Sequence, residues 1–361
     1  MTSGFLFPCF PPHVSINNEK RGVLLTARLI SLAALSTLSI LAAWVSGNVA
    51  HAAEPQIVIK FSHAAAMGTP KSISIEHFKR QVELKTNGRV RVDVYPNSTL
   101  YKDKEELEAL QMGAVQMLAP TLSKFGSLGI KEFELFDLPY LFSSRDEVSK
   151  VTHGGVGQKL FSILETRGIK GLAFWDNGFK MMSANRPIHV PSDMKGMKIR
   201  IQGSKVLDEQ MRALGANPQV MSFSEMAQAL QSGVVDGAEN PPLNFFSQKI
   251  YEVQKHLCIT NHGYLGFAVI ANKRFWDRLP ADVRQALETE LQEAGKLNDS
   301  LTERESTSAM EAIRKSGKTQ IYQPTVDEIR LWKNALIPVH KVMEERIGAS
   351  LLQQVRKELK P

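Results

Sequence analysis

Residues 196–242 read GMKIRIQGSKVLDEQMRALGANPQVMSFSEMAQALQSGVVDGAENPP, and this stretch decides the fold class. Short apolar segments alternate with amphipathic ones, which is typical of strands and helices that follow one another in an α/β sheet. Ser222 and Glu225 form an S-x-x-E capping box, and the prolines after Asn240 favour the start of another helix. We predict strands at residues 197–202, 219–221 and 234–237, helices at residues 204–214 and 226–231, and a turn at residues 239–242.

Three side chains lie at the ends of these predicted strands. Arg200 is near the end of the first strand, Phe223 follows the second, and Asn240 follows the third. Strand ends of an open α/β sheet meet at one rim, where such proteins bind ligands. Arginine binds a carboxylate through two parallel hydrogen bonds, an amide adds another, and an aromatic ring supplies an apolar wall. We therefore predict a carboxylate site; the alternatives are a surface arginine paired with an acid and a phenylalanine in the core.

The first half of the chain after residue 55 alternates strands with helices, which indicates a mainly parallel sheet. Asp103 and Glu106 are expected to cap a helix that ends near Met112. Residues 176–178, Asp-Asn-Gly, are predicted to form a turn and the first crossing between two domains. We place strands at residues 56–61, 89–95, 114–119 and 169–175, and helices at residues 71–86, 103–112 and on both sides of residues 154–155.

The second half is expected to begin with a short helix after Pro242 and to continue with two strands and then long helices. Two strands at residues 257–260 and 264–272 are separated by a predicted turn at residues 261–263. Residues 281–316 contain no proline and one glycine, with apolar residues at helical spacing, so they form one very long helix or two helices with a kink. The tail, residues 325–360, is helical with an interruption near Gly348.

The composition indicates an exported globular protein. A chain of 361 residues with 43% hydrophobic residues can bury a large core, and its length favours two domains. Basic residues precede an apolar run at residues 29–45, and Ala-His-Ala at residues 50–52 predicts a signal peptide, residues 1–52, cleaved after about Ala52. The alternative is a membrane anchor. The net charge of +7 is not gathered in a basic, aromatic-rich patch, so a nucleic-acid partner is not expected.

No motif for catalysis, metal binding or a cofactor is found. The sequence lacks G-x-S-x-G, H-E-x-x-H and C-x-x-C, and its nine histidines include no pair four residues apart. Cleavage after residue 52 would leave Cys258 as the single cysteine, which excludes an intrachain disulfide. His63 follows the first predicted strand, so we keep it as a candidate for a ligand hydrogen bond, although most such histidines are structural.

Several segments resemble the substrate-binding proteins of tripartite ATP-independent periplasmic (TRAP) transporters, of DctP type. They are FSEMAQALQSGVVDGAENP at residues 223–241, the strand from Lys198 to Arg200, and YEVQK at residues 251–255. The resemblance extends from KFSH at residues 60–63 to the C-terminal helices. It implies an α/β, two-domain clamp of the periplasmic-binding-protein kind with a long domain-bridging helix. The implied domains are residues 53–177 plus 266–305 and residues 178–265 plus 306–361.

The resemblance also implies roles for single residues. The carboxylate-binding arginine of the family falls on Arg200, its ligand-contacting asparagine on Asn240, and its aromatic wall on Phe223. A second basic position, which is arginine in sialic-acid-binding members, is Lys180 here, and this difference disfavours sialic acid. WDNGFK at residues 175–180 and FDLP at residues 136–139 resemble the C4-dicarboxylate branch, whose ligands are succinate, fumarate and malate.

We therefore expect a periplasmic receptor without catalytic activity or cofactor. It would bind a dicarboxylate between two domains and deliver it to the small and large membrane subunits of a TRAP permease for uptake driven by an ion gradient. One alternative is a receptor for a monocarboxylate or keto acid, with Lys180 paired inside the protein. The others are a sensor subunit that presents its ligand to a receptor kinase, and a secreted enzyme.

Overall fold

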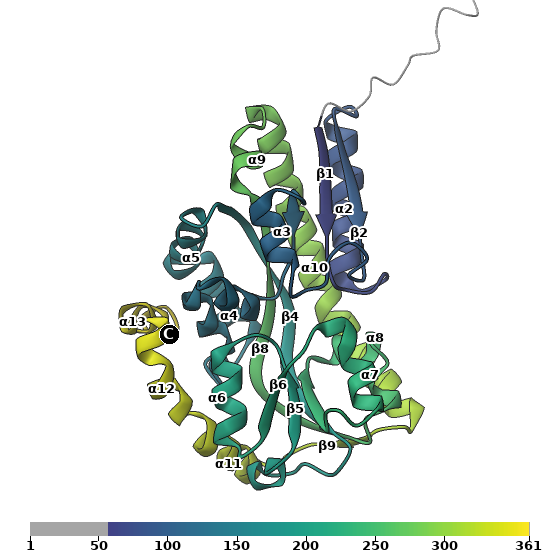
Figure 1. Cartoon of the computed structure of the whole chain (residues 1–361), viewed down its shortest axis with the longest axis vertical. Helices are drawn as coiled ribbons and strands as arrows, with labels where there is room; N and C mark the ends of the chain where they lie inside the picture. The colour runs from purple at the N-terminus through teal and green to yellow at the C-terminus, as the bar shows by residue number, and fades with distance from the viewer. Residues whose placement is uncertain (1–56, 361) are drawn as a thin grey trace, which may run out of the picture. The chain divides into compact units, whose positions relative to one another are not determined.

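Two long antiparallel strands form the middle of the fold, β4 (Ile169–Ala184) and β8 (His256–Asn272). They pair from end to end, with shifts of register at three places. Figure 1 shows both strands running through the centre, with shorter strands on either side. The structure is a computed structural model that describes residues 57–360, so the predicted signal peptide and its cleavage after Ala52 lie outside the described residues.

The described strands form one mixed sheet in the order β2-β1-β3-β8-β4-β7-β5-β6, and β9 pairs with β8. β1 lies parallel to β2 and β3, and β5 lies parallel to β6 and β7. The antiparallel pairs β3–β8 and β4–β7 attach these two parallel groups to the central strands. The other strands are β1 (Ile57–Ser62), β2 (Val90–Tyr95), β3 (Met117–Leu118), β5 (Lys198–Ile201), β6 (Asn217–Val220), β7 (Gly237–Asn240) and β9 (Gln320–Tyr322).

Helices cover the sheet, and local sequence explains several of their ends. Ser204 caps α6 by accepting a hydrogen bond from the backbone of Leu207, and Thr325 with Glu328 forms a capping box on α11. The α-helices are α2 (Pro70–Lys85), α3 (Glu106–Met112), α4 (Arg145–His153), α5 (Gly155–Glu165), α6 (Lys205–Ala213), α7 (Met226–Gln231), α8 (Pro242–Ser247), α9 (Lys273–Asp277), α10 (Ala281–Ser316), α11 (Val326–Leu336), α12 (Pro338–Ile347) and α13 (Ala349–Glu358). The 3₁₀ helices are η1 (Leu122–Leu128), η2 (Lys131–Asp137), η3 (Pro191–Met194), η4 (Phe223–Glu225) and η5 (Ile250–Glu252).

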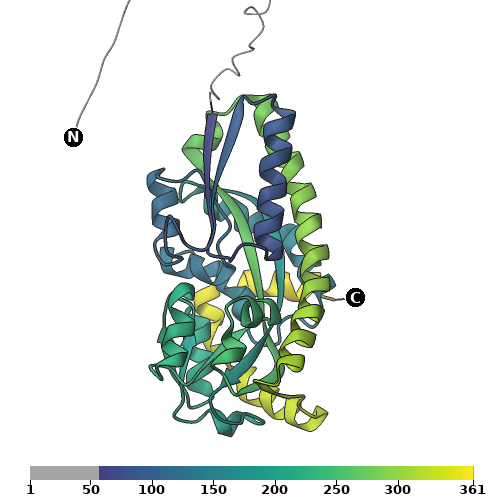
Figure 2. The ribbon, with the colours of Figure 1, turned by 90° about the vertical axis from the view of Figure 1, so that its right-hand side faces the viewer.

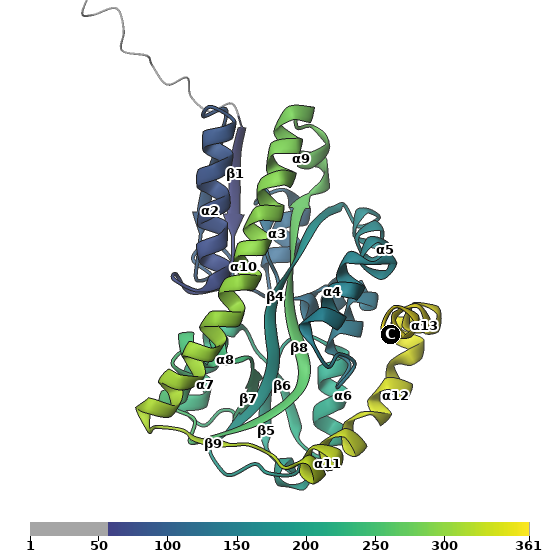
Figure 3. The ribbon, with the colours of Figure 1, turned by 180° about the vertical axis from the view of Figure 1, so that it is seen from behind.

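The helix α10 is a single helix of 36 residues, which decides between the two forms predicted for this segment. Figure 2 shows it beside α2, and Figure 3 shows it crossing the back of the sheet. Its first half packs Leu287 and Leu291 into the core under α2, β1 and β2. Its last turns place Ile313 in a second core with Phe245 of α8. One rigid helix therefore contributes to two separate hydrophobic cores.

Two predicted turns are wrong, because both lie inside the long central strands. Residues 176–178 form an irregularity within β4, where Gly178 has φ +92° and the pairing with β8 shifts between Asp176 and Phe179. Asn261, with φ +44°, lies in β8 between Cys258 and Gly263, opposite a second irregularity of β4 between Lys180 and Met182. The residues that favour turns therefore lie in bulges here, and a bulge bends and twists a strand without ending it.

Three smaller predictions also need correction. The third strand of the opening stretch is β7, three residues later than predicted, so Glu239 and Asn240 belong to the strand and not to a turn. Neither Ser222 nor Asp103 caps a helix with its side chain. Asp103 instead accepts hydrogen bonds from Lys124 and from the backbone of Phe223, so a distant partner has replaced the local one.

Gly295 in the middle of α10 is a test of how closely this helix packs on β4. A Cβ atom at this position would lie 2.9 Å from Nε1 of the buried Trp175. Gly→Ala in an exposed helix interior stabilises by roughly 0.5–1 kcal/mol. We expect the opposite for Gly295→Ala, a lower unfolding midpoint, measured by thermal or urea denaturation. Trp175→Phe should relieve the clash in the double variant, and a raised midpoint for Gly295→Ala alone would contradict this packing.

Candidate ligand-binding site

A cavity of about 450 Å³ opens beside the ends of β5 and β7. Most of its polar lining comes from side chains that are themselves nearly buried. The lining consists of Ala64, Ala65, Lys71, Asp103, Glu106, Ala119, Pro120, Thr121, Lys124, Arg200, Gln202, Phe223, Asn240, Asn244, Leu265 and Phe267.

The structure brings together the three residues that the strand ends of the opening stretch indicated. Arg200, Phe223 and Asn240 all line the cavity. The guanidinium carbon of Arg200 lies 6.0 Å from the centre of the Phe223 ring. The amide of Asn240 donates to the sulfur of Met226 at 3.3 Å, and its Oδ1 atom is buried without a partner. This oxygen can accept a hydrogen bond from a ligand.

Arg200 is 2% exposed and is held by a backbone carbonyl. Its Nε and Nη2 atoms donate to the oxygen of Met221 at 3.1 and 2.8 Å. Burial lowers the pKa of Arg200, while the charges of Asp103 and Glu239 oppose that shift. One edge of the guanidinium group is thus fixed, and the side chain presents a buried positive charge to the cavity.

Two further cations line the cavity that the sequence analysis did not identify. The Nζ atom of Lys71 donates to the oxygen of Ala119 at 3.0 Å and lies 3.8 Å above the ring of Phe267. The Nζ atom of Lys124 forms an ion pair with Asp103 and donates to the backbone oxygen of that residue at 2.7 Å. Nothing in the local pattern of either lysine distinguishes it from a surface lysine, because only the fold brings α2 and η1 to the cavity.

The cavity also contains two carboxyl groups with different environments. Burial alone would raise the pKa of Asp103, but Lys124, Arg200 and the backbone N–H of Phe223 together lower it. Burial raises the pKa of Glu106 to about 7, although Lys124 and Lys71 act against this shift. Asp103 is therefore ionised and paired, whereas Glu106 titrates near neutral pH.

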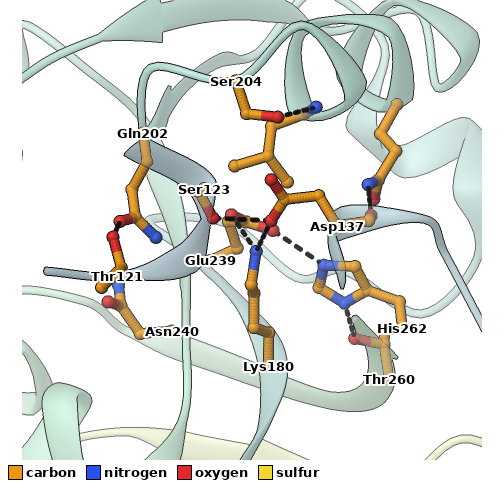
Figure 4. Close-up of polar contacts among 12 residues, drawn as sticks. Thr121, Ser123, Asp137, Lys180, Gln202, Ser204, Glu239, Asn240, Thr260 and His262 are labelled. Carbon is orange, nitrogen blue, oxygen red and sulfur yellow. Dashed lines mark hydrogen bonds and ion pairs between the residues drawn. The ribbon is translucent and has the colours of Figure 1, made fainter. Parts of the chain in front are cut away.

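Lys180, the predicted second cation, does not line the cavity. It is fully buried, and its Nζ atom lies 3.0 Å from Oε1 of Glu239 and 3.4 Å from Oδ1 of Asp137 (Figure 4). Met181 pairs with Asn240, and side chains alternate along a strand, so Lys180 shares the sheet face of Glu239. Its charge is used inside the protein, which is the arrangement that the monocarboxylate alternative expected.

The partners of Lys180 belong to a larger buried network. Nε2 of His262 lies 3.1 Å from Oε2 of Glu239, and Nδ1 of His262 lies 2.7 Å from the hydroxyl of Thr260 (Figure 4). Burial would raise the pKa of Glu239, but Lys180 and His262 lower it to about 2. Glu239 directly precedes Asn240 in β7, so the network holds the strand that places Asn240 in the cavity.

His63 also lies outside the cavity lining, directly before Ala64 and Ala65. It is fully buried, and neither ring nitrogen has a hydrogen-bond partner. Burial, together with the charge of Lys71, lowers its pKa to about 3. The imidazole is therefore neutral at physiological pH, and its role as a ligand contact stays a prediction.

Side chains from distant parts of the chain form hydrogen bonds with residues that line the cavity. Thr121 donates to Gln202, and Asn177 donates to Asn244 at 3.0 Å. At the surface nearby, Lys102 forms an ion pair with Glu225 at 2.8 Å.

Within residues 57–360, no group of three or more histidine, cysteine and acidic side chains is placed to hold a metal ion. Nor does any helix of this part of the chain have the length and apolarity needed to cross a membrane.

Lys180→Met should destabilise the fold by roughly 3–5 kcal/mol, because it leaves buried carboxylates without their cation. The pKa of Glu239 is about 2, below its ordinary 4.5, so this group stabilises the fold fully above about pH 4.5 and loses that effect as the pH falls towards 2. Urea denaturation should therefore show a gap between wild type and Lys180→Met that narrows from pH 7 to pH 3. Lys296→Met, at an exposed ion pair, is the control, and a gap independent of pH would contradict this role.

Comparison with known proteins identifies the family to which this chain belongs. Residues 61–346 match the family described as bacterial extracellular solute-binding protein, family 7, DctP. The C4-dicarboxylate-binding periplasmic protein DctP of Rhodobacter capsulatus is 57% identical over 304 residues, which cover 84% of this chain and 91% of that protein.

Solved structures agree with the sequence match. A TRAP periplasmic solute-binding protein from Sulfurospirillum deleyianum with bound succinate is 40% identical, with a TM-score of 0.81, over 83% of this chain and 98% of that chain. Another from Pseudomonas aeruginosa with bound L-malate is 38% identical, with a TM-score of 0.77, over 79% and 99%. The predicted fold class, an α/β two-domain clamp, is confirmed. The chain belongs to bacterial extracellular solute-binding protein family 7, the DctP family of TRAP transporter solute-binding proteins.

Proposed function

We propose that this protein is a periplasmic receptor that binds a C4-dicarboxylate such as succinate, fumarate or malate. The observation that carries this proposal is that Arg200, Lys71 and Lys124 line the same cavity. Lys124 is paired with Asp103, so Arg200 and Lys71 provide charge for two carboxylates, whereas a monoacid needs only one. The ligands named for two solved relatives, succinate and L-malate, are acids of this class.

In this proposal each cavity residue has a distinct role. Arg200, fixed by the carbonyl of Met221, binds the first carboxylate. Lys71 supplies the second cation in place of Lys180, which is already paired with Glu239. Two unit charges about 4 Å apart attract by roughly 4 kcal/mol at an effective dielectric constant near 20, which helps to offset desolvation of the ligand.

The cavity draws its residues from both predicted domains. Lys71 and Lys124 lie in the first, and Arg200 and Asn240 lie in the second. We propose that the domains close on the ligand and that the membrane subunits recognise the closed form. The domains are residues 53–177 plus 266–305 and residues 178–265 plus 306–361.

The remaining steps of this proposal concern transport. The chain is exported by a signal peptide cleaved after about Ala52, and it works in the periplasm without catalysing a reaction. Its partners are the small and large membrane subunits of a TRAP permease, which use an ion gradient for uptake. These assignments are supported by the family and by the named relatives.

A second candidate function is a receptor for a monocarboxylate or keto acid. The observation that favours it is the internal pairing of Lys180, because that lysine then cannot bind a second carboxylate. The two candidates share Arg200 and differ in whether Lys71 meets a ligand charge.

The exported protein should be stabilised by succinate, fumarate and malate and not by monoacids of the same length. A ligand at about 100 times its dissociation constant adds roughly 2.7 kcal/mol, which gives a clear rise of the thermal unfolding midpoint. A panel of mono-, di- and tricarboxylates measures this. A rise with monoacids alone would support the second candidate, and no rise with any acid would contradict both.

Arg200→Ala should weaken the binding of every acid by about 2–5 kcal/mol, because a buried carboxylate is left unpaired. Lys71→Met should weaken diacids far more than monoacids, since only a diacid uses the second cation. Isothermal titration calorimetry measures both effects, and Arg212→Ala, at an exposed arginine of α6, serves as the matched control. Equal losses for mono- and diacids in Lys71→Met would remove Lys71 from its proposed role.

A further inference from the structure

Glu106 is an unexpected residue in a cavity for anions. It is the first residue of α3, is 2% exposed and lines the cavity. Its Oε2 atom is buried without a hydrogen-bond partner. An ionised carboxylate at this position would repel an incoming anion and would have one oxygen without a donor.

Charged groups from three segments face Glu106. Lys71 belongs to α2, Lys124 to η1, and Asp103 to the segment before α3. The charge of Lys124 is already shared with Asp103. Lys124 therefore pairs with Asp103 and not with Glu106. Glu106 can be neutralised only by a proton or by Lys71, and the ligand also needs the charge of Lys71.

We propose that Glu106 is a specificity-determining residue that is protonated in the ligand-bound state and donates a hydrogen bond from its hydroxyl to a carboxylate oxygen of the ligand. This inference rests on the proposed function. Where Glu106 is ionised before binding, the bound dianion brings one proton from bulk water onto it; where Glu106 is already protonated, no proton is taken up. No other bond is made or broken. A carboxyl group that donates selects an acceptor oxygen, which a fully ionised dicarboxylate provides.

The pKa values of the cavity groups predict how the affinity for the ligand changes with pH. The pKa of Glu106 is about 7 in the absence of ligand, and a neighbouring dianion raises it further. Below pH 7 the proton is already present, whereas above pH 7 it must be taken up on binding, so affinity falls as the pH rises.

Two other groups bear on the same pH range. The pKa of Lys71 is lowered to about 8 by burial, so this lysine is about half neutral at pH 8 and a dianion draws about half a proton onto it there. His63, with a pKa of about 3, stays neutral throughout. Between pH 6 and pH 8 Lys71 therefore changes the dissociation constant only about twofold, and a larger change belongs to Glu106.

Calorimetric titration of the exported protein with fumarate tests this inference, because fumarate is fully ionised over the whole interval. With a free pKa of about 7, Glu106 should increase the dissociation constant about tenfold from pH 6 to pH 8, and Lys71 should add about a factor of two. Titrations at pH 8 in phosphate and in Tris, whose ionisation enthalpies differ, should show more than one proton taken up per ligand, of which close to one is lost in Glu106→Gln.

Glu106→Gln keeps a donor and removes the titration. At pH 6 it should bind fumarate with about the affinity of the wild type, and at pH 8 it should lose only the factor of about two that comes from Lys71. Glu108→Gln, at an exposed position of the same helix, should keep the full pH dependence.

Three outcomes would overturn the proposal. The first is a wild-type dissociation constant that is independent of pH between 6 and 8, and the second is full pH dependence in Glu106→Gln. The third is loss of binding by Glu106→Gln at pH 6, which would show that the carboxylate acts as an acceptor. Absence of binding of fumarate, succinate and malate at every pH would instead overturn the proposed function, and this inference with it.

Discussion

The antiparallel pairing of β4 with β8 is the constraint on which the rest of the structure depends. These strands connect the parallel group β1–β3 to the parallel group β5–β7, so the residues of both groups reach one cavity. Bulges at residues 176–178 and around Asn261 let strands of this length twist and bend without losing their pairing. The helix α10 reinforces the connection, because Asn298 and Asp299 bond the backbone of Asp176 at the first bulge.

Burying charge is the main energetic problem of the site, and backbone carbonyls and acids reduce it. Arg200 donates to Met221, Lys71 to Ala119 and Lys124 to Asp103, so each cation is partly satisfied before a ligand arrives. Buried ions need such partners because desolvation can exceed the attraction of a single pair. Arg200 and Lys71 have carbonyl partners but no ion-pair partner within residues 57–360, so their charges are available to an anion.

Sequence reasoning identified the part of the site that lies at strand ends. Arg200, Phe223 and Asn240 follow strands with clear local patterns, and parallel strands of one sheet place their ends together. Lys71 and Lys124 lie on helices, where nothing local shows which face meets a cavity. Lys180 was assigned a ligand role by resemblance, and its pairing with Glu239 was hidden because β7 begins three residues later than the pattern predicted.

By itself, the sequence determined the α/β class, the order of most helices and strands, the helical character of residues 281–316 and the family. These features depend on apolar periodicity, caps and short motifs, which act between residues close in the chain. Only the tertiary structure decided that residues 176–178 and 261–263 continue their strands, that Lys180 is neutralised internally, and that Glu106 faces the cavity. Each of these depends on a partner from a distant segment, and burial and charge pairing with such partners exist only after the chain has folded.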